Sequence, residues 1–114
     1  MELSAKLMIK NGENIFFGPG VKELLLFIDK EKSVKNAAEK MGLSYSKAWT
    51  IIKNAETGTG ETLVSRMHGG KCGGGAELTE NGKKLLSRYI EFESDAKAML
   101  EECFRRYFDG KEKA

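Results

Sequence analysis

The stretch SVKNAAEKMGLSYSKAWTIIKN, residues 33–54, decides the fold, because it predicts two short helices joined by a tight corner. Ser33 and Ser44 each stand just before a helical segment, where a serine hydroxyl accepts a free N–H of the first turn. Gly42 separates the two segments, and glycine most easily takes the left-handed conformation that ends a helix. Two alanines precede the corner and let the helix backbones approach closely. Together these features predict a helix-turn-helix.

The second helix of this pair has two sides of different chemistry. At 100° per residue, one side gathers small and aliphatic residues, with two aromatic residues at its flank: Ala48, Ile51, Ile52 and Ala55, then Tyr45 and Trp49. The opposite side holds hydroxyl, amide and lysine groups: Ser46, Lys47, Thr50, Lys53 and Asn54. That side carries no acid, whereas an ordinary amphipathic surface helix mixes both signs of charge. Such groups suit base edges and phosphates, so the helix is predicted to read DNA; the alternative is a solvated side with two lysines.

Composition sets broad limits on the function. A chain of 114 residues suits one domain, and its net charge of +2 gives no strong polyanion signal, so the local placement of charge matters more. Two cysteines in different contexts indicate reduced thiols in a cytosol, and we expect a cytoplasmic protein. No apolar run approaches the roughly 18 residues of a membrane span, and the N-terminus lacks the pattern of a signal peptide.

The residues before the helix pair predict a hairpin and a supporting helix. Within residues 5–17, apolar and polar residues alternate up to Asn11-Gly12, a pair typical of a hairpin turn. A two-stranded ribbon is not stable alone, so it must pack on the core or pair across a dimer, and we interpret it as a lid on the core. Gly18-Pro19-Gly20 is interpreted as a turn, after which the apolar stripe of residues 21–28 predicts the third helix of a trihelical core.

The residues after the helix pair predict a wing, which is a strand, a loop and a returning strand. A polar connector at residues 57–62 leads to a first strand at residues 63–66, and the second strand lies at residues 76–78. Between them, residues 67–75 hold five glycines in nine positions. Glycines let backbone N–H groups approach phosphates, and Arg66 and Lys71 supply positive charge.

Other interpretations of the glycine run are weaker. A Walker loop needs a lysine followed by serine or threonine, which Lys71 lacks. His68 and Cys72 lie four residues apart, but two ligands do not make a tetrahedral metal site, and we expect no metal and no cofactor. A redox-active Cys72 beside two cationic groups stays open as an alternative. The sequence shows neither a nucleophile beside a base nor a pair of carboxylates, which are the arrangements that indicate catalysis. We therefore expect that the protein is not an enzyme.

The last segment predicts one long helix from Glu80 to Phe108, about 43 Å in length. Its apolar residues step by 4, 3, 4, 3 and 4, which is a heptad seam: Leu85, Tyr89, Phe92, Ala96, Met99 and Cys103. So long an apolar stripe exceeds what a small domain can cover. We therefore expect a homodimer through this helix, with a helix folded back on its own domain as the alternative.

Several motifs also carry a resemblance to a known family. The N-terminal DNA-binding domain of the molybdate-responsive ModE regulators resembles this chain over about residues 5–105, and the last part also resembles the LysR-type winged helix. The motifs are GPG at 18–20, GLSYSKAW at 42–49, LVSR at 63–66, GGKCGGGA at 69–76 and LTENG at 78–82. The resemblance implies a winged-helix dimer that represses or activates transcription, with contacts at Ser46, Lys47, Thr50, Arg66 and Lys71.

Two departures from the family pattern bear on function. Cys72 stands where the wing of these regulators usually has another glycine, so a thiol function would be a local addition. The oxyanion-binding domain that normally follows is absent from these 114 residues, so we expect no molybdate binding by the family's usual route. The likeness therefore supports DNA binding better than molybdenum sensing.

The sequence thus predicts a mainly α fold with small β elements, a winged helix-turn-helix with an N-terminal β-hairpin. We expect a DNA-binding domain at residues 1–79, a dimerisation helix at 80–108 and a frayed tail at 109–114. The predicted function is sequence-specific binding of double-stranded DNA by a homodimer that regulates transcription. The alternatives are a dimeric protein-interaction module and a thiol-sensing variant. The candidate DNA-binding residues are Ser33, Ser44, Tyr45, Ser46, Lys47, Thr50, Lys53, Asn54, Arg66, Gly70 and Lys71.

Overall fold

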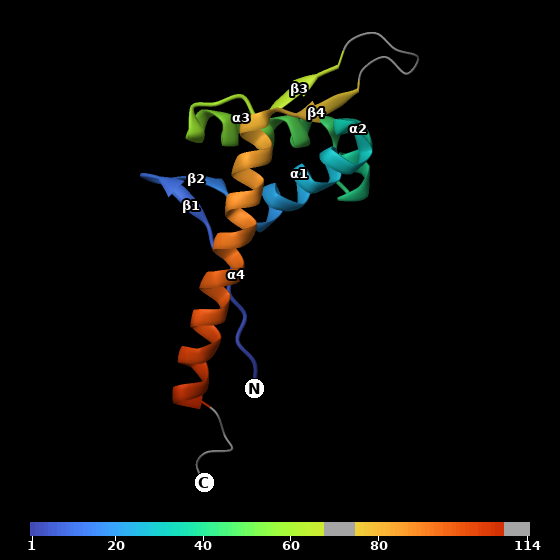
Figure 1. Ribbon diagram of the computed structural model, residues 1–114. Helices are drawn as coiled ribbons and strands as arrows, with labels where there is room; N and C mark the ends of the chain where they lie inside the picture. Colours follow the sequence, from blue (N-terminus) through green and yellow to red (C-terminus); the bar gives the residue numbers. More distant parts are fainter. Residues whose placement is uncertain (68–74, 109–114) are drawn as a thin grey trace.

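The computed structural model describes residues 1–67 and 75–108 and shows a helical domain from which one long helix extends (Figure 1). The elements in chain order are β1 (Ile9–Asn11), β2 (Asn14–Phe17), α1 (Pro19–Glu31), α2 (Val34–Lys40), α3 (Tyr45–Thr59), β3 (Val64–Arg66), β4 (Ala76–Leu78) and α4 (Glu80–Phe108). This order confirms the predicted mainly α winged helix-turn-helix with an N-terminal hairpin. The structure therefore places the second helix of the pair, α3, directly before the paired strands β3 and β4.

Three helices enclose the core of the domain. Each contributes residues that are almost completely buried: Leu24, Leu25 and Ile28 from α1, Ala37 and Ala38 from α2, and Ala48, Ile52 and Ala55 from α3. Four of these eight are alanines, and a methyl side chain lets helix backbones pack closely. The helix pair therefore contributes mainly alanines to the core, with Ile52 as its large aliphatic residue, whereas α1 contributes large aliphatic residues throughout.

The corner between α2 and α3 forms as the sequence predicted. The Ser33 hydroxyl accepts the Asn36 N–H at 3.0 Å, and the Ser44 hydroxyl accepts the Lys47 N–H at 3.0 Å. Gly42 takes a φ of +71°, a conformation that favours glycine over other residues. Because both caps and the corner glycine are local, they fix where α3 begins.

The N-terminal hairpin packs on α3, as expected of a lid on the core. β1 and β2 pair antiparallel, but Asn11 lies opposite Asn14, so the two loop residues are Gly12 and Glu13 and the predicted turn is displaced by one position. The Asn11 amide is free of the turn and donates to the Gly58 carbonyl at 3.0 Å. Gly58 must be glycine, because an added Cβ would overlap the ring of Phe16.

Two helix ends differ from the predictions. α3 continues through Thr57 and Gly58 to Thr59, where a polar connector was expected, and the buried ring of Phe16 from the hairpin packs against this last turn. α1 begins at Pro19, so the predicted turn Gly18-Pro19-Gly20 contributes its last two residues to the helix. Proline suits the first helical turn because its missing N–H would have no partner there.

The wing strands are anchored by hydrogen bonds to other parts of the domain. β3 and β4 pair antiparallel, with Arg66 opposite Ala76 at the end of the described ladder. The Glu56 carboxylate on α3 accepts the backbone N–H groups of Leu63 at 2.8 Å and Val64 at 3.3 Å. Ala76 donates its N–H to the carbonyl of Lys32, between α1 and α2, at 3.0 Å. The base of the wing is thereby fixed relative to α3.

The first half of α4 packs on its own domain. Tyr89 is 2% exposed, stacks in a tilted arrangement on Phe17 with ring centroids 4.9 Å apart, and donates its hydroxyl to the Leu7 carbonyl at 2.7 Å. Burial and the nearby Glu93 carboxylate raise the pKa of Tyr89. Leu85 also packs against the core. Tyr89 therefore belongs to the core of its own domain, where the hairpin covers it, and not to an exposed seam. Leu85 is only partly buried, and its contact with a partner chain stays a prediction.

A buried ion pair holds α4 against α1. Glu93 is 7% exposed; its carboxylate accepts a hydrogen bond from Lys22 at 2.5 Å and lies 3.6 Å from the Lys97 ammonium. The hydrogen bond from Lys22 lowers the pKa of Glu93, against the opposing effect of burial. A charged group at this depth needs its partner, because an unpaired buried charge is costly.

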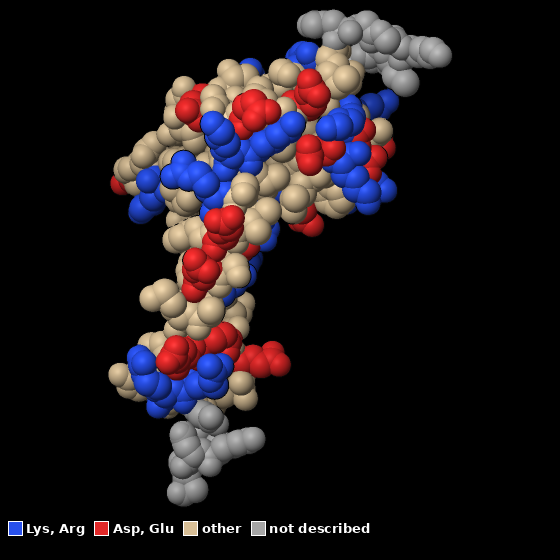
Figure 2. All heavy atoms as spheres, in the orientation of Figure 1, with Lys and Arg blue, Asp and Glu red and all other residues tan. Residues whose placement is uncertain are grey.

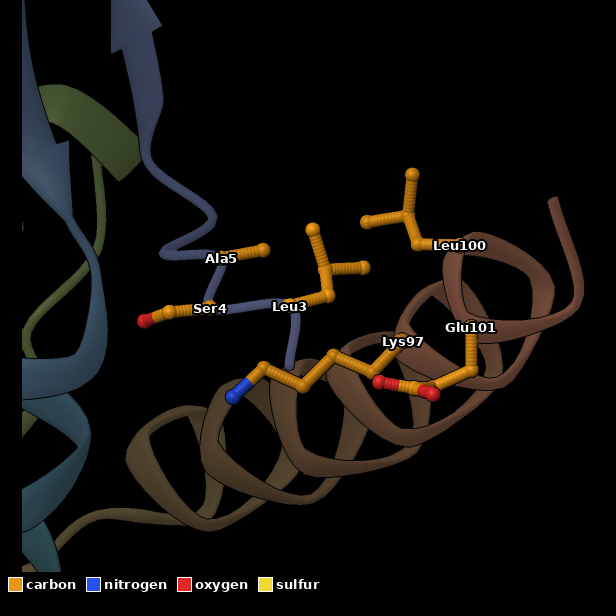
Figure 3. A pocket seen from close by; sticks show the side chains of 6 residues that line it. All are labelled: Leu3, Ser4, Ala5, Lys97, Leu100 and Glu101. Carbon is orange, nitrogen blue, oxygen red and sulfur yellow. The ribbon is translucent and has the colours of Figure 1, made fainter. Parts of the chain in front are cut away.

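The second half of α4 leaves the domain, accompanied by the N-terminal segment (Figure 1). Figure 3 shows the side chains of Leu3 and Ala5 extending toward Leu100, across a groove that Ser4, Lys97 and Glu101 complete. Large apolar side chains beyond this groove stay exposed, among them Met99, Tyr107 and Phe108. Within residues 1–67 and 75–108, no helix is long and apolar enough to span a membrane.

We predict that Gly82→Ala destabilises the fold, because the added Cβ would overlap the Leu63 carbonyl oxygen, which is backbone and cannot yield cheaply. The expected loss is about 1–3 kcal/mol in the free energy of unfolding, measured by denaturant titration. Gly20→Ala is the control: no atom lies within 4 Å of its Cβ, so stability should stay the same or rise. Equal stability of the two variants would contradict the close approach of α4 to Leu63.

A second prediction concerns Glu93→Gln, which keeps the shape of the side chain and removes its charge. The pKa of Glu93 is lowered in the fold, so its carboxylate stabilises the wild type above the unfolded-state pKa of about 4.3, and this stabilisation disappears as pH falls through the folded pKa. The variant should have a lower melting temperature than the wild type at pH 7, and this difference in melting temperature should shrink in more acidic buffer.

Thermal unfolding at several pH values measures this gap. Glu101→Gln is the matched control, because Glu101 pairs with Arg105 at 3.8 Å on the exposed part of α4 and should contribute little. A gap between wild type and Glu93→Gln that is the same at neutral and acidic pH would contradict the assignment.

Candidate nucleic-acid interface

The side of α3 that faces away from the core carries the groups expected there. Ser46, Lys47, Thr50 and Lys53 are all exposed, while Ala48, Ile52 and Ala55 are buried. The Thr50 hydroxyl donates to the Ser46 carbonyl at 3.1 Å, and its oxygen remains available as an acceptor. α3 thus presents two lysines and two hydroxyls on a side that holds no acid of its own, with the partly buried Glu56 beside Lys53 at its edge.

Three of the predicted DNA-binding residues also have structural partners. The hydroxyl oxygens of Ser33 and Ser44 accept the helix-capping N–H groups described above, which leaves their O–H hydrogens as donors. Asn54 is turned toward the hairpin, and its amide donates to the Ile15 carbonyl at 3.0 Å. These partners give all three residues a role in the fold itself.

A groove lies where the side of α3 meets strand β3. Its lining comes from neighbouring turns of the helix and one strand residue: Tyr45, Ser46, Trp49, Thr50, Lys53 and Arg66. The Arg66 guanidinium lies over the Trp49 ring, 4.4 Å from Cζ to the ring centroid, and its Nη1 donates to the Tyr45 hydroxyl at 3.4 Å. The structure therefore brings together two residues predicted from separate segments, Tyr45 and Arg66.

Trp49 is the residue of this groove that was not predicted from the sequence to bind DNA. Its helical position places it at the flank of the buried side, and it is half-buried in the structure. The Lys53 ammonium also lies over its ring, 5.6 Å from the centroid, so one indole contacts two cations. The available signal was the spacing of Tyr45 and Trp49, four residues apart on one side of a helix that a basic strand follows.

The electrostatics of the groove combine these contacts. The pKa of the Tyr45 hydroxyl is lowered, first by the indole N–H of Trp49 and further by the Arg66 guanidinium. The indole N–H nevertheless falls short of a complete hydrogen bond, and Nε1 is the one buried side-chain polar atom without a partner in the described part of the chain. Lys53 is partly balanced by the Glu56 carboxylate at 3.7 Å.

Charge over the rest of the visible surface is mixed. Figure 2 shows lysine and arginine side chains interspersed with aspartate and glutamate over the domain and along α4. Among residues 1–67 and 75–108, no group of three or more His, Cys, Asp or Glu side chains could hold a metal ion. The acid-free side of α3 therefore differs from its surroundings.

Several predicted residues lie outside the described part of the chain. Gly70 and Lys71 of the wing belong to residues 68–74, as do His68 and Cys72, which were considered for metal or thiol chemistry. The tail at 109–114 lies outside as well. Of the predicted wing contacts, Arg66 is the one that the structure places.

The remaining seam residues lie on the half of α4 that extends from the domain. Phe92 is 49% exposed, Met99 is 72% exposed and Cys103 is an exposed free thiol, while Ala96 is half-buried. Phe104 and Phe108 stack on each other with centroids 5.4 Å apart. This part of the predicted seam remains an apolar surface that the described part of the chain does not cover.

With this geometry established, comparison with known proteins identifies the family. The profile described as "Bacterial regulatory helix-turn-helix protein, lysR family" matches residues 23–83, which is more than half of the chain. The chain belongs to the lysR family of bacterial regulatory helix-turn-helix proteins. The match runs from α1 through the helix pair and the wing to the first turn of α4, so it includes the groove around Trp49.

Individual relatives of this lysR-family chain agree with the resemblance to ModE. The transcriptional regulator ModE of Yersinia pestis is 37% identical over 89 residues, which are 78% of this chain and 34% of that protein. The DNA-binding transcriptional dual regulator ModE of Escherichia coli K12 is 35% identical over 89 residues, with the same shares of the two chains. The chain thus spans about a third of the length of the curated relatives that it matches.

Solved structures agree with the fold. Full-length LysG from Corynebacterium glutamicum, a LysR-type regulator, superposes with a TM-score of 0.53 at 25% identity, and the match covers 77% of this chain and 30% of that chain. Sequence and structure comparisons therefore assign the same family to this chain.

Proposed function

We propose that this chain binds double-stranded DNA with sequence preference, as a homodimer that regulates transcription. The observation that carries the proposal is the acid-free exposed side of α3, which continues into the groove with Arg66. In a helix-turn-helix the second helix lies in the major groove, where its exposed side chains reach base edges. Membership of the lysR family and the similarity to the DNA-binding transcriptional dual regulator ModE of Escherichia coli support the same function.

Within this proposal, the residues divide by what they can reach. Lys47 and Thr50 stand on the exposed side of α3 and are assigned to bases or the phosphates beside them. Arg66 stands at the root of the wing and is assigned to the sugar–phosphate backbone. Ser33 and Ser44 stand at helix N-termini, where a phosphate can meet backbone N–H groups as well as the hydroxyls.

The proposed dimer uses the extended half of α4. Its exposed apolar residues, centred on Met99, repeat the heptad spacing of the seam and would be covered by the same residues of a second copy. A dimer would place two recognition helices on one duplex, as half-sites one helical turn apart require. The location proposed for such a regulator is the cytoplasm, where its DNA lies.

We predict that Lys47→Ala weakens binding to a preferred sequence more than to an unrelated duplex. The preferred sequence is first selected from a random pool with the wild type, and a base contact should contribute about 1–3 kcal/mol of discrimination. Affinity for both duplexes is then measured at fixed salt. Arg105→Ala is the matched control, since it removes one exposed positive charge outside the seam, in the last turn of α4, which lies far from α3 (Figure 1).

Unchanged sequence preference in Lys47→Ala would contradict the assignment of this side of α3 to bases. Failure of the wild type to bind any duplex would favour the protein-interaction module instead. The two outcomes separate a wrong residue from a wrong function.

For the dimer, we predict that Met99→Glu yields monomers, because two introduced carboxylates would be buried against each other or left without partners. Light scattering at micromolar concentration should give the wild type twice the chain mass of 12.7 kDa and the variant that mass itself. Ser94→Glu adds the same charge to an exposed position outside the seam and should remain dimeric. A monomeric wild type would refute the proposed dimer.

A further inference from the structure

Trp49 is the single tryptophan of the chain, and it joins the recognition helix to the wing. Its ring packs under the guanidinium of Arg66, from strand β3, with 4.4 Å between Cζ and the ring centroid. The two residues belong to different elements of the fold, so the contact connects α3 with β3. A guanidinium on an aromatic face is held by its attraction to the ring electrons and by stacking of the two planes.

The ring face of Trp49, and not its indole N–H, holds the two cations of the groove. Nε1 is buried and has no complete hydrogen bond with any described residue. If the N–H were the reason for a tryptophan here, a partner would be expected, because buried donors are normally satisfied. The contacts with the two cations, Arg66 and Lys53, both use the ring face. The indole N–H is directed to the Tyr45 hydroxyl and lowers the pKa of that group, but it does not complete a hydrogen bond.

Stacking fixes Arg66 while leaving its donors free. Of the guanidinium N–H groups, one on Nη1 is directed to the Tyr45 hydroxyl at 3.4 Å, and the others keep their capacity to bind a ligand in the groove. An arginine that is already held in its binding geometry loses less side-chain entropy when it binds. The Lys53 ammonium lies over the same ring, so a group that accepts from both cations is favoured.

We propose that Trp49 is a positioning residue that holds Arg66 against α3, so that the guanidinium and Lys53 bind one backbone phosphate of duplex DNA. The inference rests on the proposed DNA binding and adds the ligand group and the residue that organises it. A phosphate has oxygens enough for both cations, whereas a guanine edge occupies a single arginine fork. A phosphate contact stabilises every duplex equally, which makes the proposal testable against base reading.

The test is a double-mutant cycle of Trp49→Leu and Arg66→Ala, with affinity measured on a selected and an unrelated duplex. If Trp49 acts through Arg66, the double variant should bind as Arg66→Ala does, and not with the product of the two losses. Both single variants should weaken the two duplexes by the same factor. The salt slope should become shallower by about one unit for each phosphate that the protein no longer binds, hence about two per dimer.

Two further variants separate positioning from folding. Trp49→Phe keeps an aromatic face and should retain most of the affinity and the salt slope, whereas Trp49→Leu should lose both at similar thermal stability. A second double-mutant cycle, of Trp49→Leu and Lys47→Ala, is the matched control. Because Lys47 does not line the groove, the double variant should lose affinity by the product of the two single-variant factors. Multiplying losses in the Arg66 cycle, or a loss restricted to the selected duplex, would overturn the proposal.

A measurement without DNA tests the stacking itself. Because Trp49 is the single tryptophan, its fluorescence reports this site alone. Arg66→Ala should expose the ring and increase quenching by acrylamide, and Lys47→Ala should not. If quenching rises as expected but the wild type binds no duplex, the proposed function fails along with the phosphate site, while the stacked pair stands; if quenching is unchanged, the positioning role itself is refuted.

Discussion

The close packing of α2 and α3 through buried alanines is the constraint on which the rest of the structure depends. Ala37 and Ala38 on one helix and Ala48 and Ala55 on the other are at most 1% exposed, so larger side chains at these positions would push the helices apart. This packing fixes the angle of α3, and the angle of α3 decides which of its side chains face outward. The exposed side of α3, which begins at Ser46, is therefore determined by the alanines buried on its opposite side.

A second set of contacts connects that helix pair to its neighbours. The hairpin packs Phe16 against Gly58 of α3, and the Glu56 carboxylate binds the backbone at the start of β3. On the other side of the core, Tyr89 and Glu93 hold α4 to the hairpin and to α1. The recognition helix, the root of the wing and the extended helix therefore form one unit. A dimer formed through α4 would consequently set the distance between two copies of α3.

Sequence reasoning succeeded where the signal is local. The serine caps, Gly42 and the 3.6-residue periodicity are read within one turn of a helix, and they located α2, the start of α3 and both ends of α4. It failed where the outcome depends on distant residues. Gly58 looks like the end of a helix in the sequence, yet it lies inside α3. A glycine is needed there because the distant Phe16 ring occupies the space of a Cβ. Tyr89 fits a heptad seam yet belongs to the core, and the stacking of Arg66 on Trp49 joins segments whose approach no local pattern encodes.

The central claim is that α3 and the root of the wing form the DNA-binding surface of this lysR-family chain. The most direct test is a titration of isotope-labelled protein with duplex DNA, followed by NMR through the backbone amides and the Trp49 indole N–H. The account predicts that signals from the exposed side of α3, from Arg66 and from the indole shift together, while those of the extended half of α4 stay in place. Shifts confined to α4, with α3 unchanged, would contradict it.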